Sequence, residues 1–380
     1  MKSFDIRTKI YFGENSLDRL TDIPYKRIMI ITDPFIEKNG LLHHVTDRLQ
    51  QAYIDFSIFL DVVPDPPLEK IQLGVKALLD YNPDAVIAIG GGSAIDQAKS
   101  IREFATRANG KDIALIAIPT TSGTGSEVTS FAVVTDTENN IKYPLVSESM
   151  LPTEAILDAE LVKSVPASVT ADTGMDVLTH AIESYVSINN NEFSAALAEK
   201  AIEICGTFLL RSFLDNNDRH ARQKMHIASC LAGLAFNSSS LGLNHGIAHA
   251  IGARFHIPHG RANAIALPYV IEFNSGINKH SKSKKEYPKC VEKYCNVAKL
   301  LGVNNFNEIT TIRALVGWIQ FMNKEMNIPL SISQCGVEKS EYMNAVEQMA
   351  EKAIADSCTA TNPRVPSKAE VMLLMEHMYD

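Results

Sequence analysis

The sequence has few of the features that mark membrane-spanning or secreted proteins. Its longest apolar runs, such as 85–89 and 113–118, are far below the ~20 residues that a membrane-spanning helix needs. The opening segment, 1–13, has no basic stretch followed by an apolar core and a small-residue cleavage site, so we expect no secretory signal. These absences predict a cytoplasmic protein that does not act at a membrane.

Positive charge and paired cysteines are also scarce. The chain has 36 Lys and Arg against 44 Asp and Glu, for a net charge of -8. Nucleic acids and anionic lipids require a concentrated positive surface, so we expect neither as a partner. The six cysteines include no CxxC pair, which is typical of reduced intracellular thiols rather than a disulfide framework.

What the chain does have is length and apolar content. Its 380 residues, 46% of them hydrophobic, can bury a substantial core, and a chain of this length commonly forms about two domains. A small binding module is therefore excluded.

The first part of the chain alternates short apolar runs with amphipathic stretches. The runs are rich in β-branched residues, as expected for strands buried on both faces, and they are 27–32, 56–60, 85–89 and 113–118. Stretches between them, such as 41–52 and 68–81, follow the helical period. This alternation predicts βαβ units and a parallel sheet.

The sequence pattern changes near Pro166. This proline and the polar residues after it make a plausible domain boundary and helix start. Long segments such as 192–214 and 219–236 are then rich in Ala, Leu, Glu and Ile at helical spacing. We therefore predict an α/β domain with a parallel sheet over 1–166 and an all-helical domain over 167–380.

Two glycine- and hydroxyl-rich loops follow neighbouring predicted strands. Gly90-Gly91-Gly92-Ser93 lies between a strand and a helical pattern that begins at Ala94, where backbone N–H groups can receive an anion. The second loop runs from Pro119 to Glu127. A glycine cluster alone is usually only a tight turn, but two such loops together suggest a dinucleotide site.

Asp33 follows the first predicted strand, at the edge where open α/β sheets bind ligands. Its carboxylate could accept hydrogen bonds from an adenosine ribose and would repel a 2′-phosphate, which favours NAD over NADP. The alternative is that Asp33 is only a helix N-cap before Pro34.

Carboxylate and imidazole groups recur at helical spacing in the second half. Asp176 and His180 are four residues apart, as are His245 and His249, and His259 follows a proline turn. Four-residue spacing puts both side chains on one face of a helix, where they can chelate one ion. A lone histidine is more often a hydrogen-bonded core residue, but the joint pattern predicts a site for Fe(II), Zn(II) or Mn(II), which the sequence does not separate.

Four motifs carry a resemblance to a known family. They are GGGSAID at 90–96, PTTSGTGSEVT at 119–129, GMDVLTHAIESY at 174–185 and NHGIAHAIGARFHIPHGRANAI at 244–265. In this order they resemble the iron-containing (group III) alcohol dehydrogenases over essentially the whole chain. The opening FDIRTKIYFGENSLDRL is most similar to the 1-propanol and propanediol dehydrogenases of that family.

The resemblance implies the dehydroquinate synthase-like fold of that family, with metal and nicotinamide in a cleft between the two domains. It implies an Fe(2+) ion, with Zn(2+) as the alternative, held by Asp176, His180, His245 and His259. His249 corresponds to a non-ligand histidine beside the metal. The positions that match the NAD site are Asp33, Gly91, Gly92, Ser93, Asp96, Thr120, Thr121, Thr124 and Lys142.

The resemblance further implies an NAD(H)-dependent interconversion of a small primary alcohol and its aldehyde, such as 1-propanol and propanal. His249 is the candidate relay for the proton, because imidazole gains and loses a proton near physiological pH. Phe131 stands where lactaldehyde-type members have asparagine, which favours a plain aldehyde. By the same analogy we expect a homodimer or higher homo-oligomer and possible packaging in a bacterial microcompartment.

Two alternatives share this architecture. A zinc-dependent polyol dehydrogenase of the glycerol type would oxidise glycerol. A lyase of the dehydroquinate synthase type would use NAD transiently and would need a cluster of basic residues for a phosphorylated substrate, which the motifs lack.

Overall fold

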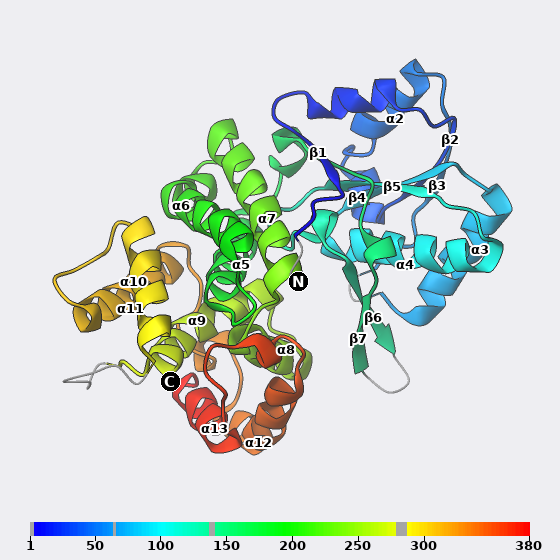
Figure 1. The fold of residues 1–380 in the computed structure, drawn as a ribbon. Coiled ribbons are helices and arrows are strands. Elements are labelled where there is room, and N and C mark those ends of the chain that lie inside the picture. The colour runs from blue at the N-terminus through cyan, green and yellow to red at the C-terminus, as the bar shows by residue number, and fades with distance from the viewer. Residues whose placement is uncertain (1–3, 64–65, 137–140, 279–286) are drawn as a thin grey trace. The chain divides into compact units, whose positions relative to one another are not determined.

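The chain divides into two compact units, Met1–Val165 and Pro166–Asp380 (Figure 1). A computed structural model describes residues 4–63, 66–136, 141–278 and 287–380. Pro166 is the N-cap of the first helix of the second unit, with φ -57° and ψ 146°. Its ring fixes φ, so the backbone is already set for the turn from loop into helix.

The first unit is built on a six-stranded sheet in the order β1-β8-β5-β4-β2-β3, and every pair of neighbouring strands in it is parallel. The strands are β1 (Lys9–Phe12), β2 (Arg27–Ile31), β3 (Asp55–Phe59), β4 (Ala85–Gly90), β5 (Ala114–Pro119) and β8 (Glu154–Leu157). The predicted parallel sheet is confirmed, with β2 to β5 within about one residue of their expected bounds. The short strands β1 and β8 were not expected.

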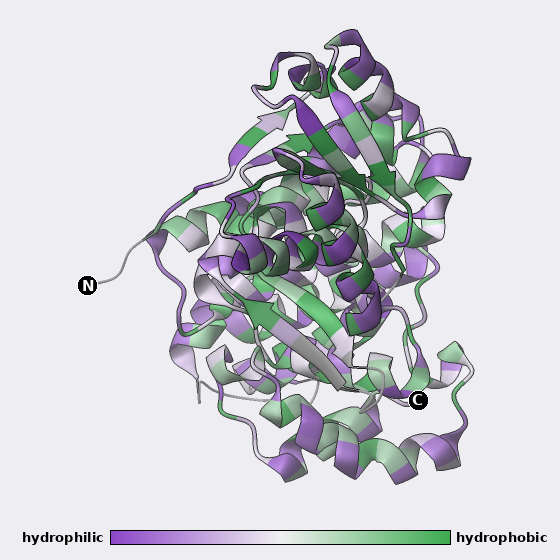
Figure 2. Cartoon of the chain, turned by 90° about the vertical axis from the view of Figure 1, so that its right-hand side faces the viewer, coloured by the Kyte–Doolittle hydropathy of each residue, from purple (hydrophilic) through white to green (hydrophobic). Residues whose placement is uncertain are grey.

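Helices cover both faces of this sheet. They are α1 (Pro34–Lys38), α2 (His43–Gln51), α3 (Leu68–Tyr81) and α4 (Gly92–Asn109), with 3-10 turns η1 (Ser16–Asp22), η2 (Ser126–Val128), η3 (Glu148–Met150) and η4 (Ala159–Val162). Along β4, Ile87 packs in one apolar cluster with Leu49 of α2, whereas Val86 packs in another with Leu78 of α3 and Ile95 of α4. Because successive side chains enter opposite cores, the central strands are apolar throughout (Figure 2).

A separate antiparallel pair, β6 (Phe131–Asp136) and β7 (Ile141–Val146), also belongs to the first unit. The sequence patterns did not predict this pair. Strand β6 follows the motif loop at 119–129 directly, and its apolar run at 131–134 is shorter than the runs that identified the central strands.

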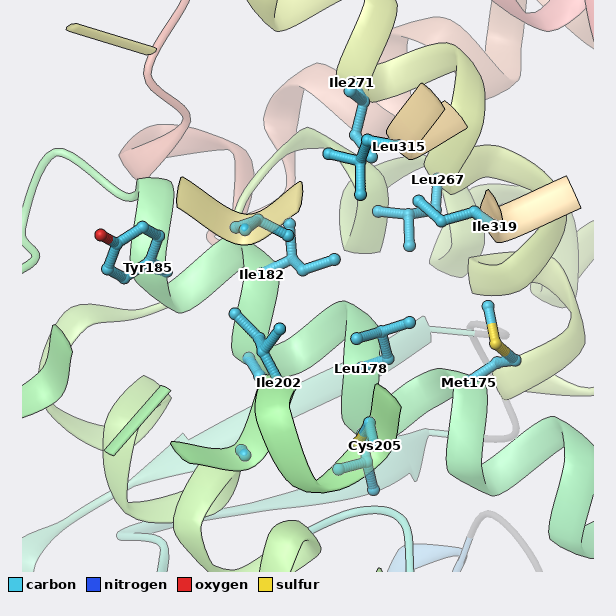
Figure 3. Packing of buried hydrophobic residues seen from close by; sticks show 14 of the residues in the cluster. Met175, Leu178, Ile182, Tyr185, Ile202, Cys205, Leu267, Ile271, Leu315 and Ile319 are labelled. Carbon is cyan, nitrogen blue, oxygen red and sulfur yellow. The ribbon is translucent and has the colours of Figure 1, made fainter. Parts of the chain in front are cut away.

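The second unit is helical, and its described residues include no strand, which confirms the expected fold class. Its helices are α5 (Ala167–Val186), α6 (Glu192–Leu214), α7 (Arg219–Ser239), α8 (Leu243–Phe255), α9 (His259–Ser275), α10 (Pro288–Leu300), α11 (Glu308–Glu325), α12 (Lys339–Ala355) and α13 (Lys368–His377), with 3-10 turns η5 (Ser333–Cys335) and η6 (Thr359–Thr361). Figure 3 shows Leu178 and Ile182 of α5 in the main core, with Ile202 of α6, Leu267 of α9 and Leu315 of α11.

No helix in the described part of the chain is both long and apolar enough to cross a membrane. All six cysteines are free thiols, in agreement with the absence of paired cysteine motifs.

Candidate metal centre and dinucleotide loops

Helix α5 supplies two of the predicted ligands from one face, while another face packs into the apolar core. Met175, Leu178 and Ile182 recur at helical spacing and pack into the apolar core (Figure 3). Asp176 and His180 lie one turn apart on another face and are also buried. The helix is therefore anchored by its apolar stripe while it presents a carboxylate and an imidazole.

Helices α8 and α9 supply the other two. His245 lies in the first turn of α8 and is buried, and His259 is the first residue of α9, after the N-cap Pro258. His256 between them adopts a left-handed conformation with φ 55°, which ends α8 and turns the chain into the next helix. The proline turn recognised in the sequence thus brings His259 back beside α5.

The four predicted ligands converge on one small region. Asp176 Oδ1 lies 3.7 Å from His245 Nε2 and 3.5 Å from His259 Nε2, and Asp176 Oδ2 lies 3.9 Å from His180 Nδ1. One ligand atom from each residue lies within 4.8 Å of the ligand atoms of the other three. Metal–ligand bonds of ~2.0–2.2 Å from each residue are compatible with such spacing.

Residues that the sequence reading did not select support these ligands. Glu183, one turn after His180 on α5, accepts a hydrogen bond from His245 Nδ1 and another from the backbone N–H of Asn244 at 2.7 Å. With Nδ1 bound to Glu183, Nε2 is the His245 nitrogen that faces the cluster. A carboxylate behind a ligating imidazole is a common arrangement in metal sites, because it fixes the tautomer and raises the basicity of the ligand.

Asn263 lies on the other side of the same group. Its Nδ2 donates to Asp176 Oδ1 at 2.7 Å and lies 3.2 Å from His245 Nε2 and 3.1 Å from His259 Nε2. Asn244 Nδ2 in turn donates to Asn263 Oδ1 at 2.8 Å. Glu183 and Asn263 both fall inside the quoted motifs, so their helical spacing from His180 and His259 was the signal available in the sequence.

The buried carboxylate and imidazoles of the cluster shift one another's pKa values. Burial raises the pKa of the Asp176 carboxyl, but the surrounding imidazoles outweigh it and hold this pKa below its ordinary value. Burial lowers the pKa of His245, yet the charge of Glu183 and hydrogen bonds to Asp176 and Glu183 raise it to about 9. Desolvation, together with the charges of the neighbouring imidazoles, lowers the pKa of His259 to about 3. One carboxylate and three imidazoles, without thiolate, form a donor set for Fe(II), Zn(II) or Mn(II).

His249 lies beside this group and is not one of its four members. Its ring stacks on His259 with the centroids 5.1 Å apart, and its centroid is 5.9 Å from that of His245. The side chain is 44% exposed, so solvent reaches it while the neighbouring His245 is enclosed.

In the first unit, the predicted dinucleotide residues gather at the carboxyl ends of the adjacent strands β2, β4 and β5. Asp33 follows β2, Gly91, Gly92 and Ser93 follow β4, and Thr120, Thr121 and Thr124 follow β5. A Cβ added to Gly92 would lie 2.7 Å from Thr124 Cγ2, so only glycine allows the two loops to approach this closely. The N-cap of α4 is Gly91, which has no side chain that could cap the helix. The first backbone N–H groups of α4 are therefore available to a ligand.

Asp33 is a helix N-cap, which is the alternative considered for it, and its position relative to the loop after β4 is compatible with the cofactor role. Its Oδ1 accepts hydrogen bonds from the backbone N–H groups of Phe35 at 2.8 Å and Ile36 at 3.0 Å, so it is an N-cap. Its Oδ2 lies 3.4 Å from the position that a Gly90 Cβ would occupy, beside the loop after β4. The cap therefore holds the carboxylate at the ligand edge of the sheet.

Two predicted cofactor positions differ from the others. Asp96, in α4, uses both carboxylate oxygens within the unit, accepting from Ser126 Oγ at 2.5 Å and from the backbone N–H of Val133 at 3.0 Å. Lys142 lies in β7, and its side chain falls outside the described residues. The geometry therefore makes Asp96 a support for the second loop.

Family models match both units. A model described as "Iron-containing alcohol dehydrogenase" matches residues 7–159, and one described as "Fe-containing alcohol dehydrogenase family, C-terminal" matches residues 170–379.

Individual proteins match over the whole chain. A 1-propanol dehydrogenase PduQ of Citrobacter freundii is 40% identical over 380 residues, covering 100% of each chain. An NADPH-dependent butanol dehydrogenase of Clostridium saccharobutylicum is 38% identical over 395 residues, covering 100% of this chain and 98% of that protein. The crystal structure of a 1,3-propanediol oxidoreductase is similar with a TM-score of 0.90 and 29% identity, covering 100% of each chain.

Proposed function

The chain belongs to the iron-containing alcohol dehydrogenase family, and we propose that it interconverts a small primary alcohol and its aldehyde by hydride exchange with NAD(H). The observation that carries the proposal is the convergence of Asp176, His180, His245 and His259 on one point. Membership of the family makes the protein an alcohol dehydrogenase, and the cofactor, the metal and the substrate are the proposed parts.

We assign the four converging residues as ligands of Fe(2+), with Zn(2+) as the alternative that the same donor set would accept. A divalent ion held there would supply Lewis acidity toward an alcohol or carbonyl oxygen. Glu183 keeps His245 in the tautomer that faces the ion, and Asn263 orients Asp176. These hydrogen bonds fix the orientation of His245 and Asp176.

For NAD, we assign the diphosphate to the loops after β4 and β5, at Gly91, Gly92, Ser93, Thr120, Thr121 and Thr124. Asp33 would accept hydrogen bonds from the adenosine ribose and would oppose a 2′-phosphate by charge repulsion. Asp96 holds the second loop, and Lys142 is retained as a candidate cofactor contact. One related butanol dehydrogenase is named as NADPH-dependent, so cofactor choice in this family needs a direct comparison.

The proposed substrate is an unsubstituted short aldehyde such as propanal. The identity to 1-propanol dehydrogenases over the full chain supports this, as does the apolar Phe131 in place of asparagine. His249 is the proposed proton relay, because it lies beside the ligand group and remains accessible to water. Replacing His249 with alanine is expected to reduce turnover and to leave metal content intact.

The remaining proposals concern organisation. We assign 1–166 to dinucleotide binding and 167–380 to metal binding and catalysis. A homodimer or larger homo-oligomer in the cytoplasm, with packaging in a bacterial microcompartment as a further possibility, is proposed by family analogy.

The test is anaerobic reconstitution of the purified protein with ferrous iron or zinc, followed by NADH absorbance with propanal, and with NADPH and glycerol in parallel. Oxidation of NADH by propanal with iron is the expected result. Glycerol oxidation supported by zinc would replace the proposal with the polyol alternative, and the absence of net redox turnover with every metal and substrate would favour the lyase. The propanol and butanol dehydrogenases among the relatives favour neither alternative.

A further inference from the structure

A carboxylate outside the ligand group contacts His249. Asp356, the C-cap residue of α12, accepts a hydrogen bond from His249 Nδ1 at its Oδ2, over 2.8 Å. The other oxygen, Oδ1, accepts from the backbone N–H of Cys358, also over 2.8 Å. The two oxygens of Asp356 are thus committed to different partners, so the carboxylate cannot rotate without losing one hydrogen bond.

The local packing makes this contact possible. Gly246 lies one turn before His249 on α8, and a Cβ added to it would lie 2.3 Å from Thr359 Oγ1 and 2.6 Å from the carbonyl oxygen of Ala353. Thr359 Oγ1 itself donates to that carbonyl at 2.6 Å, which ties η6 to the end of α12. Only glycine at position 246 allows α8 to approach this segment closely enough for His249 to reach Asp356.

The location of the proton between Asp356 and His249 determines which His249 nitrogen donates the hydrogen bond. Burial raises the pKa of the Asp356 carboxyl, but the hydrogen bond with His249 and its charge outweigh burial and lower this pKa to about 2. An ionised carboxylate only accepts hydrogen bonds, so Nδ1 of His249 must donate. In the neutral imidazole, Nε2 is then the atom with the free lone pair.

We propose that Asp356 is a positioning residue that holds His249 in the Nδ1–H tautomer, so that Nε2 is the atom that exchanges a proton with the substrate side or with water. This inference rests on the relay role proposed above for His249. It goes further by naming the tautomer, the residue that sets it and the backbone N–H of Cys358 that orients that residue.

The same three residues, His249, Asp356 and Cys358, could also be considered as a cation site because their donor atoms lie within 4.8 Å of one another. Burial and the neighbouring Asp356 raise the pKa of the Cys358 thiol well above its ordinary value. A neutral thiol beside an occupied carboxylate favours the hydrogen-bonded pair over a bound cation.

The decisive variant is Asp356→Asn. The backbone N–H of Cys358 requires an acceptor, so the carboxamide oxygen replaces Oδ1 and the NH2 group faces His249 Nδ1. That nitrogen must then accept, which drives His249 into the opposite tautomer. We expect kcat of the iron-loaded enzyme to fall by at least ~100-fold, the scale of a general acid or base contribution, with the KM for NADH and the iron content unchanged.

The tautomer is read independently of turnover by 15N NMR of histidine-labelled protein, metal-free and zinc-loaded, with the His249 signals assigned from His249→Gln. We expect the proton on Nδ1 in the parent protein and on Nε2 in Asp356→Asn, and Asp356→Glu should restore the parent tautomer and part of kcat. A parent tautomer that persists in Asp356→Asn would overturn the inference, as would a loss of kcat that merely follows a loss of iron. The NMR result stands even if the protein turned over no alcohol, so failure of the proposed function is distinguishable.

Glycine variants provide a matched pair on α8. Gly246→Ala should push α8 from η6 and lower kcat in the same way as loss of the Asp356 contact. Gly252→Ala is the control, because its added Cβ meets only the carbonyl oxygen of Ile257 at 3.2 Å. Equal effects of the two substitutions on kcat would contradict the inference.

Discussion

Each unit of the molecule contains a buried group of ionisable side chains, and the two groups are organised differently. In the first unit, Lys99 is fully buried and donates to Ser126 Oγ, Thr129 Oγ1 and the carbonyl oxygen of Phe131 at 2.9–3.0 Å. In the second unit, Asp176 faces three imidazoles. The side-chain amide of Asn263 lies among them and donates a hydrogen bond to Asp176 Oδ1.

The difference lies in whether the hydrogen bonds close within the protein. The group around Lys99 pairs a cation with Asp96 through Ser126, and each polar atom has a protein partner, so it ties the loop at 120–129 to α4. The group around Asp176 brings one carboxylate and three imidazoles together, with Asn263 Nδ2 among them. Buried charges are stable when they are paired or when they coordinate a metal, so the first group stabilises structure and the second is the proposed metal site.

Asp176→Ala should have the largest effect, because it removes the anionic member of the ligand group. We expect iron affinity to fall by more than ~100-fold, beyond the 10–100-fold typical of changes to supporting residues, and turnover to be lost. Metal content after dialysis against a chelator measures the first and NADH oxidation the second.

Asn274→Ala is the matched control for that variant. Asn274 of α9 is, like Asp176, a buried polar residue of the second unit, but it bonds Tyr294 and Asn362 instead of the ligand group. Similar metal loss in both variants would show that the effect comes from general damage to the fold.

Lys99→Met tests the closed group in the first unit. Removal of one partner from a buried, hydrogen-bonded pair typically costs about 3–5 kcal/mol, because the remaining charge has no counterion. We expect that loss in urea unfolding, weaker NADH binding by fluorescence titration, and unchanged iron affinity. Lys70→Met is the control, since Lys70 and Asp61 form a partly exposed pair that should contribute less than about 1 kcal/mol. A change in iron affinity with Lys99→Met would break the contrast between the two groups.

Glu127→Gln tests whether a buried carboxyl in the first unit makes the stability of the protein depend on pH. Burial raises the pKa of the Glu127 carboxyl to about 7 from its ordinary 4.5. The folded state therefore holds this proton more tightly than the unfolded state, and the associated stability is full below pH 4.5 and is lost as pH rises through 7. The loss approaches about 3 kcal/mol by pH 8.

The variant cannot ionise at this position, so its unfolding free energy should depend less on pH between 4.5 and 8. Urea unfolding at four pH values in that range measures both proteins. Parallel pH profiles for the two would mean that the Glu127 carboxyl has the same pKa in the folded and unfolded states.

Asp33→Ala should have the smallest effect on stability, about 1 kcal/mol for a lost N-cap. Its effect on specificity is expected to be larger. Removing the negative charge should improve kcat/KM with NADPH about tenfold relative to NADH, equivalent to ~1.4 kcal/mol. Asp33→Asn separates the two roles because asparagine is also a good N-cap. If Asp33→Asn kept the parent preference for NADH, the carboxylate charge would not set cofactor choice.

The parallel sheet was predictable because its central strands are buried on both faces. Residues such as Val86 and Ile87 enter opposite cores, which leaves an uninterrupted apolar run in the sequence. Strand β1 leaves no such run, since it has only partly buried or exposed residues. Its pairing depends on a partner far along the chain, as in Lys9 opposite Glu154.

The parts of the site that could be predicted are those whose residues lie close together in the chain. Asp176 with His180 and the histidines of 245–259 lie within single helices or one turn, so periodicity alone places them on shared faces. Asp356 is 107 residues from His249, and no local period connects them. Asp96 illustrates the opposite case, a motif residue whose carboxylate is used inside the fold.

By itself, the sequence determined the classes of the two halves, the family and the members of the ligand group, because these depend on local hydrophobic period and on motifs that occupy consecutive residues. Only the tertiary structure decided which carboxylates face His245 and His249 and which charges are paired inside the protein. Those properties depend on hydrogen bonds between helices distant in the chain, such as Glu183 to His245 and Asp356 to His249, and packing alone brings these partners together.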